Sequence, residues 1–511
     1  MKPKYAVLIG LIAMKFILQY MLIHPVYELQ RDEYLHLDQG LHLAWGYISV
    51  PPMTSWISFL IHILGGAVFW VKFFPAAFGA MTMVLVWKMI EKLNGSLYAC
   101  FLGTLAVLIS PLLRINLLYQ PNSFDIFFWT LAFYILIRWI QTGENRWIYL
   151  AAIAITLGFY SKYNILILVA ALLPAILLTP SRRIFASKHL FLAILGGIIL
   201  VLPNLIWQYQ NDFPTLHQLQ ALADTQLVNV NRLDFLKDQG LYFINSLFIF
   251  LFALVGFFSY PPFRKYQVIA FTYIFAIALF LLFKAKSYYA VGLYPVLLAF
   301  GAVFIEQLTS EGWKKYLQPV ALVVLSLLFI PVIMVAFPNK SPEQIKSQLE
   351  LYRDLGMLRW EDGKDHHLPQ DFADMVGWRE LAEKTDAVYD TIADQAHTLV
   401  LCDNYGQAGA INYYSRHKHI NAVSFNADYI NWIPLDKPIR NVIRIVEADE
   451  VDQEINDTSP IFDTVTKIGS IENPDAREFG TYIIILQNAK TDINQLIAKE
   501  IKELKEGGII H

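Results

Sequence analysis

Two adjacent carboxylates, Asp32 and Glu33, follow Arg31 directly after the first long apolar run of the chain. Ionisable side chains close to a membrane are costly and tend to be functional, so these residues are a candidate reaction centre. A structural alternative is that Asp32 caps a helix over residues 33–45, with Glu33 in its first turn. The two roles are compatible, because the start of a helix also holds a carboxylate rigidly.

Other ionisable residues stand where apolar runs begin or end. Asp125 lies in YQPNSFDIFFW, Lys162 in GFYSKYN, and Lys284 and Lys286 in FKAKSYYAVGLYP. Each alone could be a helix-terminal charge or a snorkelling lysine, and we keep that interpretation for Lys284 and Arg114. Together, acids from two segments and bases from two others suit a substrate whose phosphate lies in the membrane interface, with the reacting centre just above it.

Membrane helices are the elements that must hold these residues. The 511 residues are 56% hydrophobic and 16% charged, whereas soluble domains contain about 25% charged residues. This composition excludes an ordinary soluble enzyme, a disordered chain and a fibre. Since a span needs roughly 20 apolar residues, we predict eleven, at 5–27, 67–90, 97–113, 122–140, 146–160, 163–178, 190–208, 241–259, 266–283, 288–306 and 316–337. Residues 53–66 are apolar but short, which favours an interfacial helix.

The distribution of positive charge predicts the orientation of the spans. With the N-terminus in the cytoplasm, the inner segments carry thirteen Lys and Arg residues and the outer segments seven. The first apolar run lacks a small-residue cleavage site, so we interpret it as a retained span rather than a signal peptide. An odd number of spans then places the loops 28–66 and 209–240 and the whole C-terminal part outside, where function is expected.

The C-terminal part is a different kind of polypeptide. Residues 1–338 carry a net charge of +9 and residues 339–511 a net charge of −12. The pattern predicts strands at 398–404, 419–425, 440–448 and 481–488, a helix at 405–416 and a C-terminal amphipathic helix. We therefore expect a transmembrane domain over 1–338 and a soluble α/β domain over 339–511. Neither a Gly-rich nucleotide motif nor a basic nucleic-acid motif occurs.

Metal binding has weak support. Cys100 and Cys402 form no metal motif and are poorly placed for a disulfide. His36, Asp38 and His42 could suggest a metal, but the two histidines are not at the spacing of a helical pair, and solvated or core histidines are more common.

The motifs resemble those of the polytopic GT-C glycosyltransferases, which use polyprenyl-phosphate sugars. The likeness is to the bacterial branch related to dolichyl-phosphate-mannose protein mannosyltransferases and to the lipid A aminoarabinose transferase. It rests on RDEYLHLDQGLHLAWGYISVPPMTSWI, LLYQPNSFDIFFW, GFYSKYNILILV, KSYYAVGLYPVLLAFGA and, more weakly, CDNYGQAGAINYYS. It covers nearly the whole chain and is strongest in residues 31–140.

The resemblance implies roles for individual residues. Asp32 takes the catalytic acid position, Glu33 supports it or contacts an acceptor, and Asp125 has a supporting role. The donor phosphate would be held by the basic and phenolic residues Arg31, Lys162, Lys286, Tyr288 and Tyr289. In the aminoarabinose-type relatives a Glu just before Pro-Pro helps to bind a metal, but Ser49 and Val50 stand there in this chain. No cofactor is therefore assigned, and a divalent metal is left open.

The function expected from this resemblance is inverting transfer of a sugar from a polyprenyl phosphate to a hydroxyl of a lipid, glycan or protein. The site would face the periplasm from a bacterial inner membrane, with membrane lipids and no nucleic acid as further partners. The first alternative is a transporter or lipid flippase, although transporters place polar residues at the membrane midplane rather than at the outer ends of spans. A glycan polymerase or ligase, and a binding module on a membrane anchor, are the others.

Overall fold

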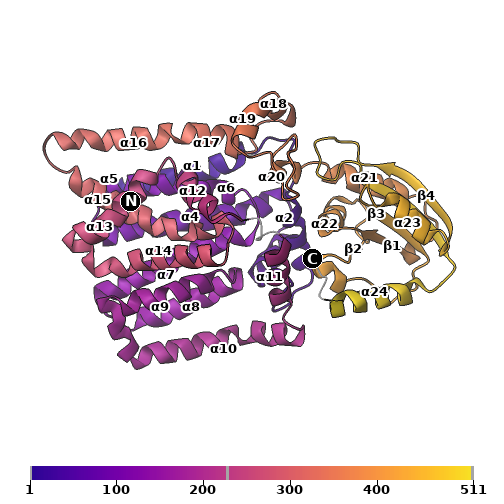
Figure 1. Ribbon diagram of the computed structural model, residues 1–511, viewed down its shortest axis with the longest axis horizontal. Coiled ribbons are helices and arrows are strands. Elements are labelled where there is room, and N and C mark those ends of the chain that lie inside the picture. Colours follow the sequence, from indigo (N-terminus) through magenta and orange to yellow (C-terminus); the bar gives the residue numbers. More distant parts are fainter. Residues whose placement is uncertain (1–2, 226–229, 508–511) are drawn as a thin grey trace.

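The computed structural model describes residues 3–225 and 230–507, and it consists of a helical membrane part and a C-terminal domain. The C-terminal domain (residues 339–507) packs against one end of the helical bundle, with its sheet farthest from the membrane part (Figure 1). The expected fold class, a helical polytopic membrane protein with a C-terminal α/β domain, is confirmed. The boundary at residue 338 stays a prediction.

The membrane part consists of helices joined by short turns. Its α-helices are α1 (Pro3–Met21), α2 (Arg31–Gln39), α3 (Met53–Ile63), α4 (Val68–Lys92), α5 (Leu97–Leu108), α6 (Pro111–Ile115), α7 (Pro121–Thr142), α8 (Arg146–Ser161), α9 (Ile165–Leu177), α10 (Lys188–Gln210), α11 (Pro214–Thr225), α12 (Arg232–Tyr242), α13 (Leu247–Ser259), α14 (Gln267–Leu282), α15 (Tyr294–Leu308), α16 (Leu317–Leu327) and α17 (Phe329–Ala336). Its 3-10 helices are η1 (Pro180–Ala186), η3 (Pro261–Tyr266), η4 (Ser287–Leu293) and η5 (Gly312–Tyr316).

Each of the eleven predicted spans coincides with a helix, but not every helix is long enough to cross a membrane by itself. Within the described residues, seven helices have the length and hydropathy of a span, and two bent helix pairs bring the number to nine. The predicted spans at 97–113 and 146–160 correspond to α5 and α8, which are shorter apolar helices. The count of eleven therefore stays a prediction.

Burial separates the helices that form the centre of the bundle from those that face lipid. In the stretch Ser287–Leu308, which contains η4 and α15, 89% of the residues in the 18-residue apolar segment are buried inside the protein. In contrast, only 11% of the residues are buried in the corresponding segments of Lys188–Gln210 and Gly312–Ala336, although both are strongly apolar. Such apolar surfaces are stable in contact with lipid, so α10, α16 and α17 form the periphery.

Helix α4 connects the two ends of the bundle. Near its start, Lys72 pairs with Glu33 of α2, and near its end, Glu91 pairs with Lys4 of α1. The basic residues predicted for the inner side, such as Lys4 and Lys88, therefore lie at the end away from the candidate reaction centre. Which of the two ends faces the cytoplasm stays a prediction.

The C-terminal domain contains a five-stranded mixed sheet in the order β2-β1-β3-β5-β4. Strand β1 is parallel to β2 and β3, and β5 is antiparallel to β3 and β4. Its elements are α18 (Pro342–Lys346), α19 (Leu349–Asp354), α20 (Gln370–Ala373), α21 (Trp378–Tyr389), η6 (Gln395–His397), β1 (Thr398–Cys402), α22 (Tyr405–Tyr414), β2 (Ala422–Ser424), η7 (Ala427–Asn431), β3 (Asn441–Val446), α23 (Val451–Thr458), β4 (Phe462–Ser470), β5 (Tyr482–Ala489) and α24 (Ile493–Gly507). The predicted strands and helices are all present, and β4 is an additional edge strand. Its burial pattern is mostly exposed, so it lacks the apolar run that marks the other strands.

The two faces of the sheet have different partners. Alternate residues such as Val400 and Ile443 pack on the side of α21 and α22, and this cluster continues into the membrane part. The intervening residues, such as Leu399 and Val442, pack with Ile493 of α24 in a separate cluster. Because one continuous core joins α22 to α2, the C-terminal domain forms part of the wall around the candidate site.

Candidate active site

The local sequence around Asp32 fixes the start of helix α2. The Gln30 side chain accepts a hydrogen bond from the Asp32 backbone N–H at 2.9 Å, and the Gln30 N–H donates to Glu33 Oε2 at 2.7 Å. This reciprocal pair is a capping box. The structural alternative, in which Asp32 caps a helix over 33–45, is therefore wrong, because Gln30 is the cap and α2 ends at Gln39.

Asp32 is partly buried and receives hydrogen bonds from two sides. The Tyr405 hydroxyl donates to Asp32 Oδ1 at 2.6 Å, and Gln120 Nε2 donates to Oδ2 at 2.9 Å. Tyr405 is the first residue of α22 in the C-terminal domain, whereas Gln120 precedes α7 in the membrane part. The two domains therefore jointly orient this carboxylate.

A chain of polar side chains connects Asp32 to Lys162. Gln120 bonds Asp32, Asn122 Nδ2 donates to Gln120 Oε1 at 3.1 Å, and Lys162 Nζ donates to Asn122 Oδ1 at 2.7 Å. Lys162 also lies over the rings of Tyr289 and Tyr288, at 4.0 and 5.2 Å from their centroids. An acid and a cation from distant parts of the sequence are thus neighbours in one polar site.

Asp125 has a different environment from Asp32. It is buried, and its two oxygens accept from Trp129 Nε1 and Asn164 Nδ2, each at 2.9 Å. Asn164 donates in addition to the Tyr289 backbone carbonyl at 3.0 Å. Asp125 therefore joins α7 to the segment after α8 and, through Asn164, to η4.

Glu33 is fully buried, and both of its oxygens are engaged. Lys72 Nζ lies 2.7 Å from each carboxylate oxygen, and the Tyr119 N–H donates to Oε1 at 2.6 Å. Lys72 comes from α4, and it is itself only 4% exposed. This arrangement suits a positioning role, because Glu33 holds α2, α4 and the segment before α7 together.

Arg31 and Lys286 each contact a residue of the C-terminal domain. The Arg31 guanidinium stacks over the Tyr405 ring at 4.4 Å, toward the C-terminal domain. Lys286 pairs with Glu361 at 3.2 Å, and although burial raises the pKa of Glu361, Lys286 beside it produces a net lowering of that pKa. Of the predicted phosphate-binding residues, the structure therefore brings Lys162, Tyr288 and Tyr289 into direct contact.

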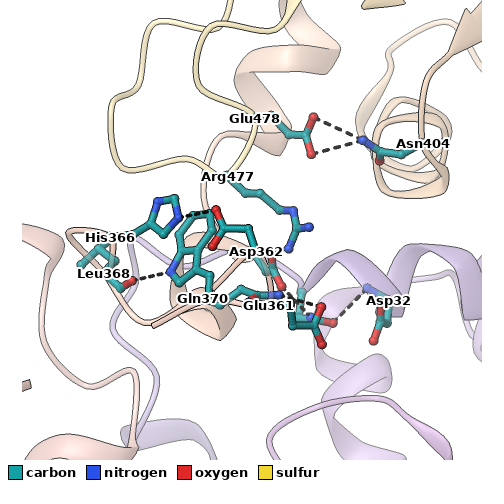
Figure 2. Close-up of polar contacts among 12 residues, drawn as sticks. Asp32, Glu361, Asp362, His366, Leu368, Gln370, Asn404, Arg477 and Glu478 are labelled. Atoms are coloured by element: carbon teal, nitrogen blue, oxygen red, sulfur yellow. Dashed lines mark hydrogen bonds and ion pairs between the residues drawn. The ribbon is translucent and has the colours of Figure 1, made fainter. Parts of the chain in front are cut away.

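The part of the site contributed by residues 339–507 was not identified by sequence reasoning. In Figure 2, the Arg477 side chain of the C-terminal domain has Glu478 on one side and Glu361 and Asp32 on the other. Arg477 pairs with Asp374 at 3.0 Å, and burial raises the pKa of Asp374 to about 6. The Asn404–Tyr405 pair at the end of a strand is a helix-start signal, but the partner of the Tyr405 hydroxyl depends on the docking of the two domains.

Lys72 was also missed, although the sequence contained a signal. A single lysine near the start of a long apolar run is unusual enough to suggest a buried acidic partner. Lys72 does not snorkel toward water, because its ammonium group is buried against Glu33.

The histidines of the first loop have other partners than a metal. His36 Nδ1 lies 3.0 Å from Gln39 Oε1, and the His42 ring stacks on Trp432 at 4.2 Å. Within residues 3–225 and 230–507, no group of three or more His, Cys, Asp or Glu side chains could hold a metal ion. No ligand set therefore supports the divalent metal that the sequence left open.

Comparison with known proteins identifies the fold. The family model of dolichyl-phosphate-mannose-protein mannosyltransferases matches residues 49–207, which include Asp125 and Lys162 but begin after Asp32. The lipid A galacturonosyltransferase RgtD of Rhizobium johnstonii is 24% identical over 204 residues, which are 39% of this chain and 42% of that protein. The match thus spans less than half the length of this curated relative.

The structural likeness extends over nearly the whole chain. ArnT from Cupriavidus metallidurans, solved with bound undecaprenyl phosphate, has a TM-score of 0.64 at 15% identity and covers 93% of this chain and 97% of its own. The same enzyme in its apo state has a TM-score of 0.62 at 14% identity. The chain therefore has the fold of the GT-C glycosyltransferases and is a multi-pass membrane protein. The predicted resemblance to this superfamily is confirmed.

Proposed function

We propose that this protein is an inverting membrane glycosyltransferase that moves a sugar from a polyprenyl phosphate to an acceptor hydroxyl. The observation that carries the proposal is the polar chain from Asp32 through Gln120 and Asn122 to Lys162. It connects an acid and a lysine at the end of the helical bundle, which supports their proposed roles as base and phosphate-binding cation. Transfer of a glycosyl group from a phosphate needs these two functions.

The donor phosphate would bind at Lys162, Tyr288 and Tyr289. Support comes from the ion–aromatic contacts of Lys162 and from the undecaprenyl phosphate that ArnT, a protein of the same fold, binds. Lys286 would join the phosphate after exchanging its ion pair with Glu361 for one with the donor. Asp125 accepts a hydrogen bond from Asn164, which in turn binds the Tyr289 carbonyl of η4. Asp125 therefore acts as a positioning residue for Lys162 and η4.

The reaction would be a single displacement at the anomeric carbon. The acceptor oxygen forms a bond to that carbon while the bond from the carbon to the phosphate oxygen breaks, which inverts the configuration. Asp32 takes the hydroxyl proton, and the polyprenyl phosphate leaves as an anion stabilised by Lys162. General base catalysis typically contributes about 10²–10⁴-fold in rate. Glu33 holds Asp32 in place through α2 and does not itself contact the acceptor.

Arg31 would serve the sugar or the acceptor rather than the donor phosphate. Its guanidinium stacks on Tyr405, and within the described residues it has no hydrogen-bond acceptor, with Nε fully buried. A guanidinium next to the catalytic carboxylate can donate to ring oxygens or hydroxyls of a bound sugar. This assignment departs from the phosphate role that the resemblance implied.

The site would face the periplasm of a bacterial inner membrane, with the N-terminus in the cytoplasm. The excess of Lys and Arg at the opposite end of the bundle supports this orientation. A lipid-borne hydroxyl is the acceptor class to test first, because the relative RgtD acts on lipid A. Glycan and protein acceptors complete the panel.

Donor turnover tests the proposal. Wild type, Asp32→Asn and the control Asp234→Asn, an exposed acid of α12, would be purified in nanodiscs and given a panel of polyprenyl-phosphate sugars with acceptor extract. Release of free polyprenyl phosphate would be followed by mass spectrometry, with and without a chelator. We expect release by wild type and control and a loss of at least about 100-fold in Asp32→Asn.

Two outcomes would contradict this function. Turnover by Asp32→Asn at the wild-type rate would remove Asp32 from the chemistry. No release with any donor, together with lipid flux in proteoliposomes, would favour the transporter alternative. Loss of turnover with the chelator would show that a divalent cation takes part.

A further inference from the structure

A pocket of about 330 Å³ opens where α1 and α4 meet the C-terminal domain. Asp32 is not among the residues that line it, and Lys72, the partner of Glu33, forms part of its inner wall. The pocket is therefore separate from Asp32 and adjoins the Glu33–Lys72 pair. Its volume is within the range of about 300–1,000 Å³ that is usual for small-molecule sites.

The rim of this pocket is apolar and exposed. Tyr20, Val26 and Val68 line it with exposed fractions of 39, 41 and 46%, and the adjacent Met21 and Phe69 are 71 and 50% exposed. These residues stand at the end of α1 and the start of α4, at the membrane boundary on the side of the C-terminal domain. Clustered apolar side chains at such a boundary are stable when lipid chains cover them.

One cation in the pocket, Arg379, is held by a long ion pair with an acid of the same pocket, Glu28. The Arg379 guanidinium stacks on Tyr414 at 4.8 Å, and its Nε lies 3.9 Å from Glu28 Oε1, beyond hydrogen-bond distance. Within residues 3–225 and 230–507, the guanidinium has no hydrogen-bond acceptor. The Lys72 ammonium, in contrast, is already bound to both Glu33 oxygens.

The acid in the pocket is engaged elsewhere. Glu28 accepts from the backbone N–H groups of Trp378 and Arg379 at 2.7 and 3.2 Å, at the start of α21. Burial on balance raises the pKa of Glu28, although these hydrogen bonds and Arg379 oppose the increase. An external anion at Arg379 would replace the long Arg379–Glu28 ion pair, while Glu28 keeps its bonds to the start of α21. His24 also lines the pocket and accepts from the Val26 N–H at 3.3 Å.

We propose that this pocket binds the phosphate of a lipid in the leaflet next to the C-terminal domain. The phosphate would contact Arg379, whose five donors suit phosphate oxygens, and the acyl chains would cover the exposed ends of α1 and α4. Binding of the phosphate does not depend on the transferase activity, whereas the distinction between its two sources rests on the proposed function. Two sources share this chemistry, namely a bulk anionic phospholipid and the phosphate of an acceptor lipid.

Binding of dioctanoyl phosphatidic acid to the purified full chain in neutral detergent tests the site. We expect Arg379→Gln to weaken its affinity about fivefold, as for one basic residue at an anionic lipid. Val26→Trp, which fills the mouth without changing charge, should weaken it at least as much. Arg440→Gln is the matched control, because the Arg440 and Arg379 side chains are both 62% exposed.

Kinetics separate the two sources. A raised KM for the acceptor with unchanged kcat in Arg379→Gln would identify the acceptor lipid. An unchanged KM, with loss of the dependence of turnover on phosphatidylglycerol in the nanodisc, would identify bulk phospholipid. Wild-type affinity for phosphatidic acid in both Arg379→Gln and Val26→Trp would overturn the proposal, even if the enzyme transfers sugar normally.

Discussion

Neighbouring carboxylates in α2 have different surroundings, because successive helical residues point in different directions. Asp32 is partly buried and bonded by neutral donors, Tyr405 and Gln120. Glu33 is fully buried and bonded by a lysine. The first arrangement leaves a carboxylate that can approach a substrate, and the second produces an anchor.

Removal of one partner of the Glu33–Lys72 pair should destabilise the protein strongly. A buried charge that loses its partner typically costs about 3–5 kcal/mol. Glu33→Gln and Lys72→Met should therefore both lower the midpoint of thermal unfolding, measured by intrinsic fluorescence in detergent. The exposed pair Asp234–Lys237 is the comparison, since breaking such a pair changes stability by less than about 1 kcal/mol. Equal midpoints for Glu33→Gln and Lys237→Gln would refute the anchoring role.

At the scale of elements, the site depends on the close contact between α2 and α22. Tyr34 of α2 packs against the rings of Trp378, Tyr413 and Tyr414, at 5.7 to 5.9 Å between centroids. Gly409 permits this approach, because a Cβ there would lie 2.6 Å from both Tyr34 Cβ and the Tyr429 hydroxyl. The same contact brings Tyr405 to Asp32.

Gly409→Ala should therefore impair activity from a position outside the reaction centre. The added methyl group has to push α22 away from α2, and such overpacking costs about 1–3 kcal/mol. We expect lower donor turnover and a lower unfolding midpoint. Gly196→Ala in α10 is the control, because a Cβ there meets no atom within 4 Å. Normal turnover in Gly409→Ala would show that the position of Tyr405 does not matter.

At the scale of the whole molecule, two buried acids connect the membrane part to the C-terminal domain. One acid belongs to each part, and each accepts hydrogen bonds from the other part. Asp38 of α2 accepts from Asn412 and Tyr429, each at 2.7 Å. Asp428 of the C-terminal domain accepts from Gln39 at 2.8 Å and from the Ile48 N–H at 2.9 Å. Burial raises the pKa of both carboxyls to about 6, although these hydrogen bonds oppose the increase.

These pKa values predict how stability depends on pH. Because the folded-state values exceed the ordinary value of 3.8, the folded protein binds these protons more tightly than the unfolded chain. Their contribution to stability is therefore largest below pH 3.8, falls as the pH rises to about 6, and is constant above. The variant Asp38→Asn/Asp428→Asn should remove this dependence.

The comparison is the difference in unfolding midpoint between the double variant and wild type from pH 4 to 8. Burial also lowers the pKa of His36, but His36 is present in both proteins, so its titration does not change the difference between their midpoints. The double variant should gain stability relative to wild type as the pH rises toward 6. A difference that is independent of pH would show that these carboxyls titrate normally.

Much of the fold could be predicted from the sequence, because it depends on local signals. Apolar runs located the long apolar helices but not α11 and α12, which lie mainly in the predicted outer loop 209–240. Alternating residues bounded by turn residues located all but one strand of the sheet. The exception, β4, is an exposed edge strand whose residues carry no such pattern. The unusual charges Asp32, Asp125 and Lys162 were visible as exceptions within apolar sequence, and the structure brings them into one region.

The sequence by itself determined the class of protein and the residue types available for chemistry, since hydropathy and charge act over short stretches of chain. Only the tertiary structure decided which carboxylate faces the site and which is an anchor. It also decided that Tyr405 reaches Asp32 from the C-terminal domain. These outcomes depend on the packing of α2 against α4 and α22, and such contacts between distant segments leave no local pattern in a single sequence.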